Sequence, residues 1–175
     1  MLGLVFDRIL RALSAAESDP RLIFHQPIHT AEDAAGLDGL PDFTEVKSAV
    51  WQGREGRLVV TTVPANRRVD VKRVSTLLGT GGLRLANESL LQEQLGIERG
   101  GVAPFGYETD CYCVLDVGVA ESEGILISPG RNDATLALSR RDVAALAAAF
   151  GCSISPIVTD HPSSGDTPPL ASKSS

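Results

Sequence analysis

The chain has 175 residues, a net charge of −6 and a sequence pI of about 5.0, and 43% of its residues are hydrophobic. This size and composition predict one soluble globular domain whose core needs no disulfide or metal. The acidic balance excludes broad, non-specific binding to a nucleic-acid backbone, although a small basic face can still contact one nucleic-acid end. No apolar run reaches the roughly 20 residues of a membrane span, and no signal peptide is expected, so we expect a cytoplasmic protein with reduced thiols.

Periodicity and turn residues in the first half of the chain predict alternating helices and short strands. Apolar residues at helical spacing indicate an amphipathic helix within residues 1–18. The further elements expected here are a strand at 21–24, a short helix capped by Thr30 with Asp33 as its partner, a loop at 36–41, and strands at 46–50 and 57–63 joined by a turn.

The second half predicts the same kind of alternation. Its expected elements are a helix at 69–78 closed by Gly79, a strand at 83–85, a helix capped by Asn87 and ending at Gly96, a central strand at 110–117, a hairpin of 124–128 and 134–138, and a helix from a capping box at Ser139 and Asp142 to Phe150. From residue 153 onward serine and proline dominate, which predicts a disordered tail. We therefore expect one α+β or mixed α/β domain at residues 1–152 and a tail at 153–175.

Two segments are candidates for chemistry. Lys47 shares a strand face with Ala49 and Trp51, which favours a partly desolvated positive charge in a cleft, although a lysine extending from a sheet surface explains the pattern too. The run from Gly100 to Gly106 holds three glycines and a proline, which form a shaped loop with accessible backbone N–H groups. Such donors can stabilise an oxyanion, and a purely structural connection is the alternative.

Weaker signals lie elsewhere. The hairpin tip carries small polar groups that can line a site or simply serve the turn: Ser128, Gly130, Asn132, Asp133 and Thr135. A basic cluster of Arg67, Arg68, Lys72 and Arg73 is either a solvated helix face or a contact for RNA phosphates. His25 and His29 are separated by Pro27, which excludes a helical metal pair, so neither metal nor another cofactor is expected.

Taken together, these segments resemble the YbaK/ProX family, the free-standing relatives of the editing domain inserted in some prolyl-tRNA synthetases. The resemblance extends from about Phe24 to about Gly151. The matching pieces stand in family order at residues 25–34, 45–48, 70–74, 83–86, 95–96, 100–106, 127–130, 132–135, 138–139 and 142–143. Each piece alone is weakly specific, whereas the ordered set is quite specific.

The resemblance implies a strongly curved, barrel-like mixed sheet flanked by helices, and hydrolysis of the ester that joins a wrong amino acid to the 3′ end of a tRNA. The implied substrate is tRNA for proline carrying alanine, cysteine, serine or threonine, bound by its acceptor end, with prolyl-tRNA synthetase as a candidate partner and no DNA. The family's lysine falls on Lys47 and its glycine loop on Gly100 and Gly101. Thr30, Ser48, Ser128, Gly130, Asn132 and Thr135 are the expected substrate-binding residues.

Branch-specific residues do not select one amino acid. Ser128 matches the branch that acts on cysteinyl-tRNA, in which an acidic residue is expected near Thr135. The branch that acts on alanyl-tRNA has an asparagine where Ser48 stands and a histidine where Ser128 stands, yet residues 132–135 are closer to that branch.

No serine or cysteine shows a base partner in the sequence, so a covalent nucleophile is not expected. Two other functions remain open. One is an inactive module of the same fold that binds tRNA or a synthetase without hydrolysis. The other is an esterase acting on simple amino-acid esters without tRNA.

Overall fold

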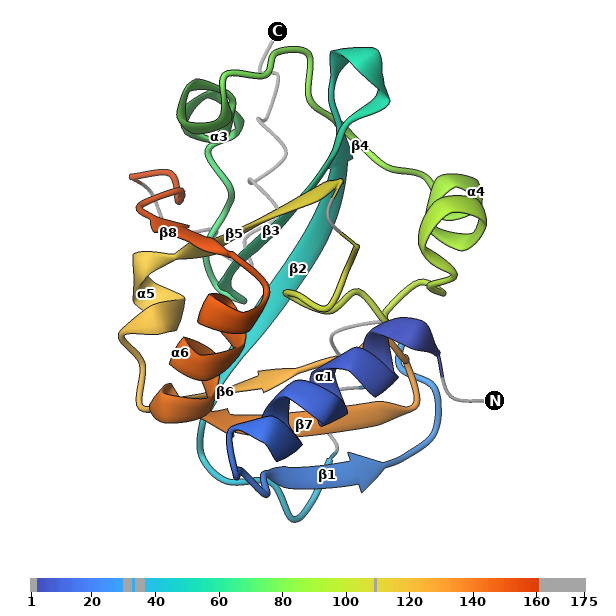
Figure 1. The fold of residues 1–175 in the computed structure, drawn as a ribbon, viewed down its shortest axis with the longest axis vertical. Helices are drawn as coiled ribbons and strands as arrows, with labels where there is room; N and C mark the ends of the chain where they lie inside the picture. The colour runs from blue at the N-terminus through green and yellow to red at the C-terminus, as the bar shows by residue number, and fades with distance from the viewer. Residues whose placement is uncertain (1–2, 30–32, 34–36, 109, 161–175) are drawn as a thin grey trace, which may run out of the picture.

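The computed structural model describes residues 3–29, 33, 37–108 and 110–160. Its strands form one mixed sheet in the order β1-β7-β6-β2-β3-β5-β8, with β4 paired to β2. The bounds are β1 (Arg21–Phe24), β2 (Thr44–Gln52), β3 (Leu58–Pro64), β4 (Arg84–Leu85), β5 (Cys111–Asp116), β6 (Gly124–Ile127), β7 (Ala134–Ser139) and β8 (Ser153–Ser155). In Figure 1, β1, β6 and β7 cross the direction of β2 and β3 steeply. The expected mixed α/β fold is confirmed, and its sheet is open, with β1 and β8 at the edges.

Strand β2 joins the two halves of the sheet. Its first residues pair in parallel with β6, where Glu45 lies opposite Leu126. From Val46 onward it pairs antiparallel with β3, where Lys47 lies opposite Val63. The change of partner within three residues places Lys47 where the two halves of the sheet meet.

Seven helical segments accompany the sheet in the described residues. They are α1 (Leu4–Ala15), η1 (Arg54–Gly56), α3 (Val71–Leu78), α4 (Glu88–Leu90), the π-helical turn η2 (Leu91–Leu95), α5 (Val117–Ala120) and α6 (Arg140–Ala149). Their ends follow the predicted signals. Asp70 accepts a hydrogen bond from the Arg73 N–H and Ser139 forms a capping box with Asp142, while Gly79 and Gly96 close their helices with left-handed backbone.

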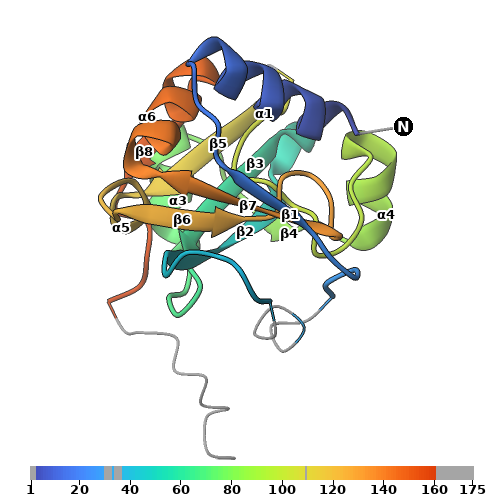
Figure 2. The ribbon, with the colours of Figure 1, turned by 90° about the horizontal axis from the view of Figure 1, so that it is seen from below.

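The helices cover the two faces of the sheet unequally. Figure 2 shows α1 and α6 together on one side of the sheet. Beneath them lies the larger core, which includes Ile9, Leu146 and Leu115. The opposite face has a smaller core in which Val74 of α3 packs against Val59 and other strand residues. Alternation along β3 and β5 supplies both cores, because successive side chains point to opposite faces: Val60 and Leu115 face the larger core, and Val59 and Val114 the smaller one.

The structure differs from the sequence expectation at residues 153–160. Ser153–Ser155 forms β8, which pairs in parallel with β5. Ile157 is fully buried, and its N–H donates to the Asp116 carboxylate at 2.8 Å. Serine and proline content predicted disorder here, but one buried isoleucine and a paired strand outweigh composition. The expected tail at 161–175 lies outside the described residues.

The helix expected after Thr30 also lies almost wholly outside the described residues. Of that segment Asp33 is described, and its carboxylate accepts a hydrogen bond from the His29 N–H at 3.1 Å. Within the described residues, no helix combines the length and apolar character that crossing a membrane requires.

Candidate functional site

A cavity of about 620 Å³ opens at the junction of the two halves of the sheet. Five of the residues predicted for the site line it: Lys47, Ser48, Gly100, Ser128 and Thr135. They come from β2, from the loop after η2, from the end of β6 and from β7. The fold therefore brings together residues that lie up to 88 positions apart in the chain, since 135 − 47 = 88.

Lys47 supplies a positive charge to this cavity. It forms no ion pair with any residue in the described ranges. Partial burial, together with the positive charge of Arg68, lowers the pKa of Lys47 below its ordinary value. An unpaired, partly desolvated ammonium beside a second cation favours binding of an anion or a carbonyl oxygen.

The glycine loop meets the cavity at Gly100, whose backbone has a φ of +85°. A Cβ at this position would overlap the carbonyl oxygen of Ile28, so packing alone requires glycine here. The Gly100 N–H has no hydrogen-bond partner among the residues that the structure describes. It is therefore available as a donor at the edge of the cavity.

Gly101 has a different environment from Gly100. Its N–H already donates to the Glu98 carbonyl at 3.0 Å. A Cβ on Gly101 would lie 3.1 Å from the backbone of Arg131 and of Asn132. In this conformation the predicted pair of oxyanion donors is thus reduced to one, and Gly101 serves close packing of the loop on the β6–β7 turn.

Two other predicted site residues lie outside the cavity: Asn132 supports the loop, and Gly130 packs on α1. The Asn132 side chain is 6% exposed and donates to the Glu98 carboxylate and the Arg99 carbonyl, both at 3.2 Å. Gly130 packs on α1, where a Cβ would come within 2.9 Å of Val5. Neither residue lines the cavity. Thr30, the remaining candidate, lies outside the described residues.

Tyr107 anchors the far end of the glycine loop. Its hydroxyl donates to the Ala103 carbonyl at 2.7 Å and accepts from the Ala103 N–H at 3.0 Å. Burial raises the pKa of Tyr107 well above its ordinary value, which keeps the hydroxyl protonated and able to donate. The sequence reasoning did not identify this residue, because its role depends on a local contact that glycine and proline content does not reveal.

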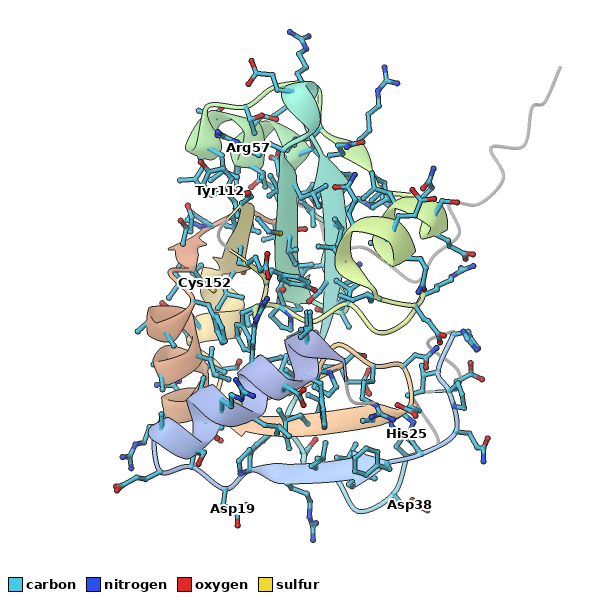
Figure 3. All side chains as sticks on the ribbon, turned by 45° about the vertical axis from the view of Figure 1, so that its right-hand side comes forward. Asp19, His25, Asp38, Arg57, Tyr112 and Cys152 are labelled. Atoms are coloured by element: carbon cyan, nitrogen blue, oxygen red, sulfur yellow. The ribbon has the colours of Figure 1, made fainter. Side chains whose placement is uncertain are left out.

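The hydroxyl groups near the cavity have different partners. Thr135 contacts His25, the residue labelled at the end of β1 in Figure 3, with 2.8 Å between Oγ1 and Nε2. Ser48 Oγ lies 2.7 Å from Thr62 Oγ1, so that hydroxyl is directed into the sheet. The contact of His25 with Thr135 was not predicted, since the two residues are 110 positions apart.

The remaining lining gives the cavity an apolar wall and two carboxylates. The wall comes mainly from the segment before β2 and includes Leu37, Leu40, Pro41 and Phe43. Asp42 and Glu45 also line the cavity. Charges of both signs thus lie around one apolar space.

Two of the four residues of the basic cluster predicted from the sequence, Arg67 and Arg73, are engaged within the protein. Arg73 forms ion pairs with Asp70 at 3.4 Å and Asp160 at 3.0 Å, and Arg67 donates to the Thr159 carbonyl at 2.8 Å. Arg68 is exposed and acts electrostatically on Lys47. In the sequence, the only indication of this role of Arg68 was its place in the basic cluster. No group of three metal-ligating side chains was found among the described residues.

Comparison with known proteins supports one family. A family model described as an aminoacyl-tRNA editing domain matches residues 25–146. The prolyl-tRNA editing protein ProX of Acetoanaerobium sticklandii is 26% identical over 148 residues, with 82% of this chain and 90% of that protein covered. The proline–tRNA ligase of Thermosipho africanus is 25% identical over 118 residues, which cover 67% of this chain and 21% of the ligase.

Solved structures agree on the fold. One, described as a candidate trans-editing enzyme for prolyl tRNA synthetase, has a TM-score of 0.71 at 24% identity, with 91% of this chain and 99% of that chain covered. The structure of a hypothetical protein has a TM-score of 0.72 at 24% identity, with 87% of this chain and 99% of that chain covered. Likeness at this level of identity concerns the arrangement of the strands and helices.

Proposed function

This chain belongs to the aminoacyl-tRNA editing domain family, and from that premise we propose that it is a trans-acting deacylase of mischarged tRNA. The proposed substrate is tRNA for proline esterified with a small non-cognate amino acid: alanine, cysteine, serine or threonine. The observation that carries the proposal is the presence of Lys47, Gly100 and three hydroxyl-bearing side chains on one cavity. The proposed setting is the cytoplasm, with prolyl-tRNA synthetase as a candidate partner.

The reaction needs little covalent help, because an aminoacyl ester is already activated. A water oxygen bonds to the carbonyl carbon, the ester C–O bond breaks, the ribose oxygen takes a proton, and the free amino acid leaves. The neighbouring ribose hydroxyl of the substrate is the proposed relay: it accepts the water proton and passes its own proton to the leaving ribose oxygen. No protein nucleophile is required: the Ser48 hydroxyl is hydrogen bonded to Thr62, and Thr135, whose hydroxyl contacts His25, is assigned to the space for the amino-acid side chain.

The proposed role of Lys47 is to bind the negative charge that develops on the ester or the terminal phosphate of the tRNA. Its side chain is exposed, its ammonium is partly desolvated, and it pairs with no described carboxylate, so it can bind an anionic group of the substrate. The Gly100 N–H is assigned the carbonyl oxygen in the transition state. Gly101 contributes by holding Gly100 in place through its bond to Glu98.

The remaining lining residues are proposed to bind the amino-acid part of the ester. Asp42 and Glu45 provide negative charge for the α-ammonium group of the ester. Ser128 and Thr135 border the side-chain space, and the apolar segment 37–43 closes it from the other side. A net charge of −6 restricts the tRNA contact to the acceptor end, so we expect binding to weaken as salt rises.

Deacylation of tRNA for proline, charged separately with alanine, cysteine, serine, threonine and proline, tests this function. Hydrolysis of at least one non-proline ester, with prolyl-tRNA spared, is the expected result. Lys47→Ala should lower that rate by roughly 10²-fold, and Lys47→Arg, which keeps the charge, should lose less. Tight binding of the charged tRNA without turnover would instead identify an inactive binding module, and hydrolysis of simple amino-acid esters alone would identify an esterase.

A further inference from the structure

All three cysteines of the chain lie together, away from the proposed active site. Cys111 and Cys113 point to the same face of β5 because they are two residues apart on a strand. Cys113 belongs to the larger core, and Cys111 and Cys152 pack against that core. The side chain of Cys113 lies beside those of both others and interacts with each of them. None of the three lines the active-site cavity.

The sheet register places Cys113 beside Cys152. Strands β5 and β8 pair in parallel, and Val114 opposite Ser153 is the first pair of the ladder, so Cys113 and Cys152, each one residue earlier, lie side by side just before it. Adjacent strands lie about 4.8 Å apart, which is within the range of about 4.4 to 6.8 Å that a disulfide allows between Cα atoms. Figure 3 shows Cys152 between the end of α6 and β5.

The alternative pairing along β5 is geometrically poorer. Residues two apart on an extended strand have Cα atoms roughly 6.6 Å apart, close to the upper limit, and parallel side-chain directions. A Cys111–Cys113 bond would therefore distort the central strand between β3 and β8. The lateral pair needs no such distortion.

Cys113 and Cys152 differ in solvent accessibility, which indicates which thiol reacts first. Cys113 is 7% exposed, whereas Cys152 is only partly buried at the turn after α6. Interaction with Cys113 lowers the pKa of Cys152, whereas the two neighbouring thiols and burial raise the pKa of Cys113. Cys111 is also only partly buried and lines a second cavity, but it lies along β5 from Cys113, whereas Cys152 lies across from it. Cys152 is thus the partly exposed nucleophile and Cys113 its neighbour across the strands.

We propose that Cys152 and Cys113 are a thiol modification site that a hydroperoxide converts to an intramolecular disulfide. The Cys152 thiolate attacks the outer peroxide oxygen, the O–O bond breaks, and an alcohol or water leaves, giving a sulfenic acid. Cys113 sulfur then attacks Cys152 sulfur, the S–S bond forms, and water leaves with the thiol proton. Two thiols are oxidised and one hydroperoxide is reduced in the overall step.

Peptide mapping of the full chain after treatment with hydrogen peroxide, with free thiols blocked by N-ethylmaleimide, tests the site. Trypsin places Cys113 on peptide 100–131 and Cys152 on peptide 142–173, and chymotryptic cleavage after Tyr112 separates Cys111 from Cys113. A cross-link joining Cys113 to Cys152 is expected, lost in Cys152→Ser and retained in Cys111→Ser.

A bond within peptide 100–131, a Cys152 sulfinic acid beside an alkylated Cys113, or unreacted thiols would each overturn the proposal. Mapping of the wild-type chain decides the matter even where a variant does not fold. The readout is chemical and independent of deacylation, so its failure would leave the proposed function untouched.

Discussion

The Tyr107 hydroxyl is hydrogen bonded to both backbone groups of Ala103, at 3.0 Å from its nitrogen and 2.7 Å from its oxygen. One side chain thereby closes the loop that begins at Gly100. Both residues are buried, so water cannot reach the N–H and carbonyl of Ala103, and the Tyr107 hydroxyl satisfies both groups instead.

Tyr107→Phe should therefore destabilise the protein and loosen the loop. Removing the hydroxyl leaves a buried N–H and carbonyl unsatisfied, at an expected loss of about 1 to 3 kcal/mol in the free energy of unfolding. Urea denaturation measures this loss. Tyr112→Phe is the matched control because Tyr112 is exposed, and an equal loss in both variants would refute the anchoring role of Tyr107.

Gly100→Ala should be more costly than the same change at Gly96. Both glycines have positive φ values, 85° and 64°, but a Cβ at Gly96 meets nothing within 4 Å whereas one at Gly100 meets the Ile28 carbonyl. The backbone penalty common to both is about 1 to 2 kcal/mol. Thermal and urea unfolding of the two variants should show the additional overlap at Gly100, and equal stabilities would argue against this packing.

Arg68→Gln should raise the pKa of Lys47. Burial and the Arg68 charge both lower that pKa, so removing the charge leaves only burial and the ammonium persists to higher pH. The rate of reductive methylation at Lys47, followed against pH by mass spectrometry, reports the free amine. The methylation profile of Lys47 should move to higher pH in the variant, with Lys72 on α3 as the internal reference for reagent activity. An unmoved profile would show that Arg68 does not act on Lys47.

If deacylation depends on the Lys47 ammonium, its pH profile should shift in the same direction as the pKa of Lys47. As pH rises through the lowered pKa, the charge is lost and enzyme-dependent deacylation should fall, after subtraction of the spontaneous rate. Arg68→Gln should extend activity to higher pH. A pH profile identical in both proteins, beside a shifted methylation profile, would separate the charge of Lys47 from catalysis.

Thr135→Val should change selectivity among the esters. Valine keeps the shape of threonine but removes the hydroxyl that contacts His25. A polar group in the side-chain space commonly discriminates by one to two orders of magnitude, so we expect the ratio of rates for seryl and alanyl esters to change by about 10-fold. Thr135→Ser should restore the ratio. Equal slowing of every ester would indicate that Thr135 supports the fold rather than selects the amino acid.

Local signals were enough to predict most of the elements. The capping residues Asn87 and Ser139 and the glycines that end helices act within one turn of chain, so their effects can be read without knowing the fold. The short helix α5 was missed, because four residues between β5 and β6 carry too little periodicity. Strand β8 was missed because its own residues have little strand propensity, and it is held as a strand by pairing with β5.

The site was less predictable than the fold for the same reason. Lys47 and Gly100 were identified as candidates, but the commitment of the Gly101 N–H to Glu98 depends on loop geometry. Asn132 was expected to contact substrate and instead holds the loop through Glu98 and Arg99. Polar residues at a turn look alike in sequence whether they face a cavity or the chain beside them.

Because β2 pairs first with β6 and then with β3, the number of residues between Glu45 and Lys47 is fixed by the sheet. Glu45 is fixed opposite Leu126 and Lys47 opposite Val63, so one inserted or deleted residue between them would turn the lysine to the other face of the sheet. The segment at residues 37–43 has no ladder to keep and forms the apolar wall. Under the proposed function, a change of length or composition in that wall can therefore alter the accepted amino acid without disturbing β2, whereas a change in the spacing from Glu45 to Lys47 displaces the lysine.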